Sequence, residues 1–193
     1  MKTKISLKTR TTRLLTSALS VLLLAPAPFA ETVATESMVR SSQPDSGAAN
    51  QITTVYLVRH AEKHLDQGKD PDLTEQGVSR SRRWADVFSN QSLDEIYSTD
   101  TTRTLNTAQP IAESQGKPVA LMDPIPENLN ELIGKHLGKS ILMVGHSNTL
   151  PDLVNAMIGE KHYADLDESN YNTLFIVTLN GNTAIAQQLK ISL

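Results

Sequence analysis

Four residues of the chain have side chains that could do chemistry together. Arg59 and His60 are neighbours in the sequence. Arg103 lies in a later segment rich in hydroxyl side chains, and His146 lies in a third segment. Guanidinium groups form paired hydrogen bonds with phosphate, and a neutral imidazole is a competent nucleophile near pH 7 because its unperturbed pKa is about 6.5. Together these residues predict phosphoryl transfer through a covalent phosphohistidine.

Each of the three segments follows a predicted strand. The short runs at 53–58, 93–97 and 140–144 are rich in apolar and β-branched residues, a pattern typical of buried strands. Helices are expected to begin close to the second and third segments. Ligands of parallel sheets bind beyond the carboxyl ends of the strands, and helix N-termini favour anions. We therefore expect the three segments to meet at one edge of a sheet and form one phosphate site.

Strand and helix patterns alternate along the chain. Helices are expected at 73–88, 100–115, 127–136 and 149–158. In the first of them, one apolar face can be formed by Val78, Trp84, Ala85 and Phe88. Further strands are expected at 118–121, 173–179 and 184–191. The last two are joined by Asn180-Gly181-Asn182, a strong turn signal. This order of elements predicts an α/β fold with a mostly parallel sheet.

Four motifs connect the chain to a known family. They are LVRHAEK (57–63), DPDLTEQG (70–77), YSTDTTRTLNTA (97–108) and VGHSNT (144–149). In order and spacing they resemble the motifs of the histidine phosphatase superfamily (phosphoglycerate mutase-like), over nearly all of residues 53–193. The resemblance implies a three-layer α/β/α sandwich with a mostly parallel central sheet. It also implies no metal and no organic cofactor.

The resemblance further implies that His60 is the nucleophile. Arg59, Arg103 and His146 would then surround the transferred phosphoryl group. Charge-assisted hydrogen bonds to that group are worth about 1.5–3 kcal/mol each, and a bound anion should raise the pKa of His146. Arg103 lies in the first turn of its predicted helix, where a cation opposes the helix dipole. A role in binding therefore explains this arginine better than a structural role does.

Two further residues are candidates for substrate binding. Lys63 lies three residues after the predicted nucleophile, and Asn148 lies two residues after His146. Asn148 could position that histidine or contact substrate. Ser147 and Asn148 are also typical helix N-caps, and capping is the favoured role of Ser147.

The proton donor for the leaving group is not supplied by the motifs. Many members of the family carry a glutamate in a WEG-like insertion after the third strand, and another branch has an aspartate directly after the second histidine. This chain has a short connection without that insertion, and Ser147 stands at the second place. Glu127 is the candidate proton donor because it follows the third-strand loop, although an acidic residue is also favourable in the first turn of a helix. Asp152 is a less favoured candidate.

The remaining charged and histidine side chains are expected to be structural or solvent-exposed. Glu62 would bond a catalytic group or face solvent. The histidines expected at the surface are His64, His136 and His162. The arginines expected on a solvated helix face are Arg80, Arg82 and Arg83.

The N-terminal part has the order of an export signal. Residues 1–30 contain five cations and no acidic residue. The cations all lie before an apolar run at 14–24, and small residues follow this run up to Ala30. This order predicts a secretory signal peptide over 1–30 with cleavage near Ala30, since the run is too short for a comfortable membrane span. An uncleaved anchor is the alternative. Residues 31–50 are polar and aperiodic, typical of a flexible tether, so the domain is expected at 51–193.

Composition narrows the class of function. Without the signal, 13 cations remain against 21 acidic residues, a net charge of −8 that argues against nucleic acid as a partner. The absence of cysteine excludes disulfides and a cysteine nucleophile. The sequence thus predicts a secreted or periplasmic phosphatase, with no stable membrane span after signal cleavage. Its expected partner is a phosphorylated small molecule or envelope component. The alternatives are an activity like that of phosphohistidine protein phosphatases, or a catalytically weak phosphate-binding module on the same scaffold.

Overall fold

The computed structural model describes residues 51–192, and the predicted signal peptide and tether lie outside them. The strands of the described part are β1 (Ile52–Arg59), β2 (Glu95–Ser98), β3 (Val119–Leu121), β4 (Ser140–Gly145), β5 (Thr173–Asn180) and β6 (Thr183–Lys190). Its helices are α1 (Glu75–Phe88), α2 (Thr102–Gln115), α3 (Pro126–Gly134) and α4 (Thr149–Ile158). None of these helices is long and apolar enough to cross a membrane.

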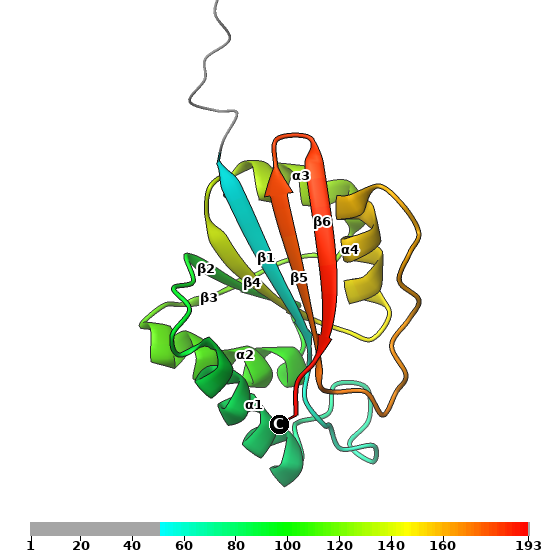
Figure 1. Cartoon of the computed structure of the whole chain (residues 1–193). Coiled ribbons are helices and arrows are strands. Elements are labelled where there is room, and N and C mark those ends of the chain that lie inside the picture. Colours follow the sequence, from blue (N-terminus) through cyan, green and yellow to red (C-terminus); the bar gives the residue numbers. More distant parts are fainter. Residues whose placement is uncertain (1–50, 193) are drawn as a thin grey trace, which may run out of the picture. The chain divides into compact units, whose positions relative to one another are not determined.

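The strands form one mixed sheet in the order β3-β2-β4-β1-β5-β6 (Figure 1). The first four strands of this order pair in parallel, whereas β5 pairs antiparallel with both β1 and β6. Apolar side chains of α1 and α2 pack on one face of the sheet, and those of α3 and α4 pack on the other. The predicted α/β/α sandwich with a mostly parallel sheet is therefore confirmed.

The apolar runs are buried because strand side chains alternate between the two faces. In β1, Val55 and Leu57 point into the α3–α4 layer, while Val58 points into the α1–α2 layer. Met143 and Val144 of β4 divide in the same way. Each fully buried side chain of this size contributes about 1.5–3 kcal/mol. The central strands therefore anchor both helical layers and hold the carboxyl ends of the strands in a fixed place.

Three side chains differ from the sequence expectation because of tertiary contacts. Val78 was expected on the inner face of α1 but is 38% exposed, and Gly77 and Ser81 are buried there instead of it. Arg80 is not solvated, since it forms a double hydrogen bond with the Glu62 carboxylate at 2.6–2.9 Å. His136 is buried, and its Nε2 lies 2.7 Å from Tyr97 Oη.

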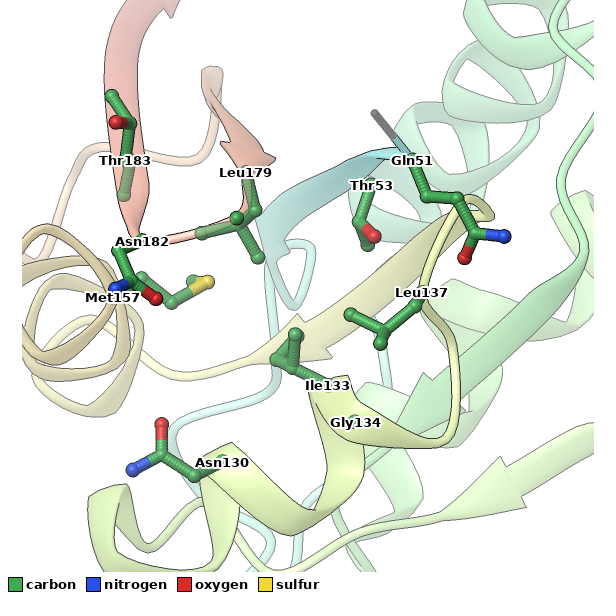
Figure 2. A pocket seen from close by; sticks show the side chains of 12 residues that line it. Gln51, Thr53, Asn130, Ile133, Gly134, Leu137, Met157, Leu179, Asn182 and Thr183 are labelled. Carbon is green, nitrogen blue, oxygen red and sulfur yellow. The ribbon is translucent and has the colours of Figure 1, made fainter. Parts of the chain in front are cut away.

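A cavity of about 300 Å³ lies at the edge of the sheet where β1 begins (Figure 2). It is bounded by α3, the β5–β6 turn and residues such as Thr53 and Met157. No charged side chain lines it. A phosphate ion would lose its hydration there without gaining a cationic partner, so the phosphate chemistry must be sought at the opposite edge.

Gly77 marks a close contact between α1 and the loop that follows β1. The Glu62 carbonyl accepts a hydrogen bond from the Thr74 amide at 2.9 Å. Thr74 is the N-cap of α1, and its Oγ1 accepts from the Gly77 amide at 3.1 Å. A Cβ at position 77 would overlap the Glu62 carbonyl, so only glycine fits without backbone movement.

We expect Gly77→Ala to lower the free energy of unfolding by about 1–3 kcal/mol, as overpacking does elsewhere. Gly134→Ala is the matched control, since a Cβ at this helical position meets nothing within 4 Å. That variant should be neutral or more stable by about 0.4–1 kcal/mol. Urea unfolding followed by circular dichroism measures both. Equal stability of the two variants would show that the loop moves aside freely.

Candidate active site

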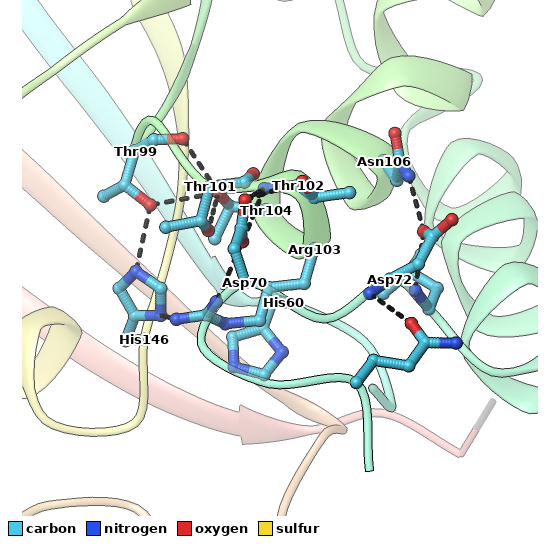
Figure 3. Close-up of polar contacts among 12 residues, drawn as sticks. His60, Asp70, Asp72, Thr99, Thr101, Thr102, Arg103, Thr104, Asn106 and His146 are labelled. Carbon is cyan, nitrogen blue, oxygen red and sulfur yellow. Dashed lines mark hydrogen bonds and ion pairs between the residues drawn. The ribbon is translucent and has the colours of Figure 1, made fainter. Parts of the chain in front are cut away.

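Backbone pairing brings the three polar segments together at the carboxyl ends of β1, β2 and β4. In the parallel register Arg59 lies opposite Gly145. The His60 amide donates to the Gly145 carbonyl at 2.9 Å, and the Thr99 amide donates to Val144 at 3.3 Å. Figure 3 shows the polar contacts that join the second segment to His146, with His60 of the first segment beside them. The predicted meeting of these segments is confirmed.

His60 is 3% exposed and has a defined tautomer. Its Nδ1 lies 2.8 Å from the Ala61 carbonyl, which can only accept, so Nδ1 carries the proton and Nε2 keeps its lone pair. Burial lowers the pKa of His60 to about 3, the Ala61 hydrogen bond opposes that shift, and the cations of Arg59 and Arg103 add to it. The imidazole is thus neutral at pH 7, as a nucleophile must be.

His146 lies beside His60, with 5.4 Å between the ring centroids. Its Nε2 is 3.0 Å from Thr99 Oγ1, and its Nδ1 is 3.4 Å from an Arg103 amino group. Arginine only donates, so Nδ1 accepts and Nε2 donates to the threonine. Burial, followed by Arg103 and Lys63, lowers the pKa of His146 to about 4. The sequence predicts that the pKa of His146 is raised when an anion is bound. In the free site its pKa is lowered instead, so the ring is neutral.

A chain of hydroxyl groups holds His146, and the sequence reasoning did not single it out. Thr99 Oγ1 donates to Thr104 Oγ1 at 3.0 Å. Thr104 in turn donates to the Thr99 and Thr101 carbonyls at 2.8 and 2.9 Å. Because the Thr104 proton is committed to carbonyls, Thr99 must accept from the histidine. The hydroxyl-rich motif therefore sets the tautomer of His146.

Arg103 lies at the start of α2 with its side chain 14% exposed. One amino group pairs with Asp70 at 3.3 Å. Asp70 also accepts from the Thr102 hydroxyl at 2.7 Å and from the Thr102 amide at 3.0 and 3.1 Å, and these hydrogen bonds lower its pKa. A residue from the loop before α1 thus caps α2 and balances a cation that opposes the helix dipole.

Arg59 is almost completely buried and is held by the loop that precedes β5. Its Nη1 donates to the carbonyls of Asp167, Glu168 and Asn170 at 3.0–3.2 Å. The guanidinium carbon lies 4.4 Å from the centre of the Tyr171 ring, a cation–π contact. The loop over 165–171 therefore folds against the site.

The Nε atoms of Arg59 and Arg103 are buried without a hydrogen-bond partner among the described residues. A buried unpaired donor is costly, especially on a charged group. Two such donors beside a neutral imidazole fit a site built for an anion.

Glu168 reaches back to the site from this loop. Its Oε2 pairs with Arg59 Nη2 at 2.7 Å, and its Oε1 accepts from Ser147 Oγ at 2.7 Å. The capping role favoured for Ser147 is therefore wrong, because its hydroxyl bonds the loop and not the helix. Asn148 is the N-cap residue of α4, but its side chain makes no capping hydrogen bond.

A family model described as histidine phosphatase superfamily (branch 1) matches residues 55–128. The phosphoserine phosphatase 1 of Hydrogenobacter thermophilus is 42% identical over 82 residues, which span 39% of this chain and 39% of that protein. Residues 55–128 of the chain belong to the histidine phosphatase superfamily. The family match includes His60 and the hydroxyl-rich motif that contains Arg103.

Solved structures resemble this chain over a longer part of its length than the family model matches. A mutant phosphoserine phosphatase of Entamoeba histolytica, in complex with phosphoserine, has a TM-score of 0.59 and 16% identity over 69% of this chain and 94% of that one. The protein histidine phosphatase SixA complexed with tungstate has a TM-score of 0.58 and 18% identity, covering 71% and 96%. A mycobacterial glucosyl-3-phosphoglycerate phosphatase has a TM-score of 0.61 and 12% identity, covering 73% and 100%. At these identities the likeness shows the fold.

The other predicted site residues differ in their position relative to the site. Lys63 is partly buried, and its charge contributes to the lowered pKa values of both His146 and Glu168, which places it beside the site. Asn148 is exposed next to Ser147. Glu127 is exposed in the first turn of α3, and no hydrogen bond or ion pair among residues 51–192 joins it to the three segments.

Burial of His60 predicts a pH dependence of stability. The folded histidine has a pKa of about 3 against 6.5 for the free group, so the unfolded chain binds more protons between these values. The free energy of unfolding should therefore fall as pH drops from 6.5 toward 3. Urea midpoints at pH 7 and 4.5 measure this fall, and His60→Gln should reduce it. An identical fall in the variant would contradict a buried neutral imidazole.

Proposed function

We propose that this chain is an exported phosphatase that hydrolyses phosphomonoesters, or a phosphorylated envelope component, through a phosphohistidine on His60. One observation carries the proposal. The hydrogen bond from His60 Nδ1 to Ala61 leaves Nε2 unprotonated, in a buried site with two arginines whose Nε donors are unpaired. An imidazole with a free lone pair beside unsatisfied cationic donors suits attack on phosphorus.

The reaction has two steps. In the first, the His60 Nε2 lone pair attacks phosphorus of a phosphomonoester monoanion, the bond from phosphorus to the ester oxygen breaks, and the alcohol leaves with the proton that the monoanion brought. In the second, water attacks the phosphohistidine, the P–N bond breaks, its electron pair returns to Nε2, and the protons of the water leave with the phosphate. Arg59 and Arg103 neutralise the phosphoryl oxygens, and this preorganised charge costs no reorganisation during the reaction.

His146 contributes to the same oxygens in a way that depends on protonation. In the free site its Nδ1 accepts from Arg103 and has no proton to give. A bound phosphoryl dianion favours the imidazolium form, which donates from both nitrogens. The Thr99 contact keeps the ring in place during this change.

The substrate class follows from several lines of support. The relatives include phosphoserine, glucosyl-3-phosphoglycerate and protein histidine phosphatases. The predicted signal peptide would separate this chain from cytoplasmic phosphotransfer proteins. The connection between β3 and α3 is short, so this part of the chain supplies no cap over the site. A site without a cap from this connection favours an accessible phosphomonoester or a phosphorylated surface group.

A phosphohistidine protein phosphatase activity is the second candidate. Among residues 51–192, no hydrogen bond or ion pair joins the site to Glu127, the donor expected from the sequence. A phosphohistidine substrate has a better leaving group and needs less acid assistance than an alkyl phosphate does.

The test assays the full chain, recovered after expression with its signal, against p-nitrophenyl phosphate, phosphoserine, sugar phosphates and a phosphohistidine peptide. Turnover of esters supports the first candidate, and turnover of the peptide alone supports the second. N-terminal sequencing of the recovered protein tests export, with a start near Glu31 expected. No turnover across the panel, despite binding of inorganic phosphate, would leave only the phosphate-binding module.

A further inference from the structure

A carboxylate on the loop before β5 lies at the rim of the site. We propose that Glu168 is the acid–base residue of the reaction, protonating the leaving oxygen and then accepting a proton from the attacking water. The inference rests on the proposed phosphatase function and supplies the proton donor that its first step requires.

Two contacts hold Glu168 against the two segments that carry the histidines. Its carboxylate bridges Arg59, which precedes His60, and Ser147, which follows His146, with 2.7 Å to each. The loop is fixed there by the Leu166 amide, which donates to the Ser147 carbonyl at 2.9 Å. The Glu168 side chain is nevertheless 76% exposed. It can therefore exchange protons with solvent and reach a group that leaves outward from the pocket.

Two other carboxylates near the site hold neighbouring elements in place. Asp70 accepts three hydrogen bonds from Thr102 and pairs with Arg103, so its acceptor positions serve the start of α2. Glu62 forms a double hydrogen bond with Arg80 on α1. Within residues 51–192, Glu168 is thus the carboxylate that bridges the two histidine-bearing segments and stays open to solvent.

The proton reaches Glu168 with the substrate. In the free site the Ser147 hydrogen bond and the Arg59 charge lower the pKa of Glu168, so the carboxylate is ionised. A bound phosphoryl group shares Arg59 and places a second anion nearby, which raises the pKa of the carboxyl. A phosphomonoester monoanion can then pass its proton to Glu168 and react as the dianion.

The protons and charges balance over one turnover. As His60 Nε2 attacks phosphorus, the ester oxygen takes the electron pair of the broken bond and the proton of Glu168. The carboxylate then takes one proton from water while the oxygen of that water bonds to phosphorus. Release of phosphate with this proton restores the ionised Glu168 and the neutral His60.

The experiment compares Glu168→Gln with the wild type on two substrates. Glutamine keeps the size of the side chain and can still accept from Ser147, but it cannot transfer a proton. For an alkyl phosphate, whose leaving oxygen must be protonated, kcat should fall by about 100-fold. The leaving group of p-nitrophenyl phosphate is a phenolate that needs no proton. For this substrate, the rate constant of the first step, measured in a single turnover, should fall less than about fivefold. Glu160→Gln, an exposed change at the end of α4, should affect neither.

The outcomes separate the two proposals. An equal loss on both substrates would overturn the assignment, because it would mean that Glu168 only holds Arg59. A leaving-group-dependent loss in Glu127→Gln and not in Glu168→Gln would transfer the role to α3. Absence of turnover by the wild type would overturn the proposed function itself. Circular dichroism of each variant confirms that it folds.

Discussion

Replacing His60 with alanine is expected to reduce phosphomonoester turnover by at least about 10⁴-fold, as loss of a catalytic nucleophile does in other enzymes. Arg59 and Arg103 would remain to bind phosphate, so the Kd for inorganic phosphate should change far less than kcat. The buried alanine leaves space, but the backbone hydrogen bond from position 60 to Gly145 is retained. The variant should therefore fold and bind without reacting.

Acid-labile label from a phosphorus-labelled substrate should be trapped on the wild type and absent from His60→Ala. His162→Ala is the matched control, because His162 is exposed and far along the chain from the three segments. Trapping on any other residue would contradict the mechanism while leaving the phosphatase activity intact. Full turnover by His60→Ala would contradict both.

Arg103→Ala is expected to lower kcat/KM by about 10²–10³-fold, the usual cost of removing one preorganised donor to a transition-state anion. Inorganic phosphate should also inhibit the variant more weakly, by about 10–100-fold in Ki, since a charge-assisted hydrogen bond contributes about 1.5–3 kcal/mol. The helix should survive, because Asp70 still caps it through Thr102.

Arg82→Ala on α1 is the control for Arg103→Ala. Arg82 is exposed, and its removal should leave kcat/KM and the phosphate Ki within about twofold of the wild type, as surface changes usually do. Equal losses in the two arginine variants would contradict the pocket assignment and point to a general effect of positive charge.

The fold was largely predictable from local patterns. Helix α4 begins and ends where the periodicity predicts, and Gly116 and Gly159 end α2 and α4 in the left-handed conformation that favours glycine. Other boundaries shift by one or two residues, and some strands are extended by pairing beyond the apolar run. Arg59, for example, joins β1 opposite Gly145. The inner face of α1 was misjudged at Val78, since the helix turns Gly77 toward the Glu62 carbonyl.

The candidate site was predictable where its residues lie in strand-end motifs. Parallel pairing of β1, β2 and β4 had to bring Arg59, His60, Arg103 and His146 together. Thr99 was not singled out, since its hydroxyl acts on a histidine 47 residues away. Glu168 was missed because it lies in an irregular loop without a motif, 109 residues after its partner Arg59.

The sequence alone determined the class of fold, the residues with phosphate chemistry and their common edge of the sheet. These follow from hydrophobic periodicity and residue type, which are local properties of the chain. Tertiary structure alone decided the tautomers of His60 and His146, the burial of Arg59 and the placement of Glu168 over the site. These depend on hydrogen bonds and desolvation between segments far apart in the chain, for which one sequence carries no local signal.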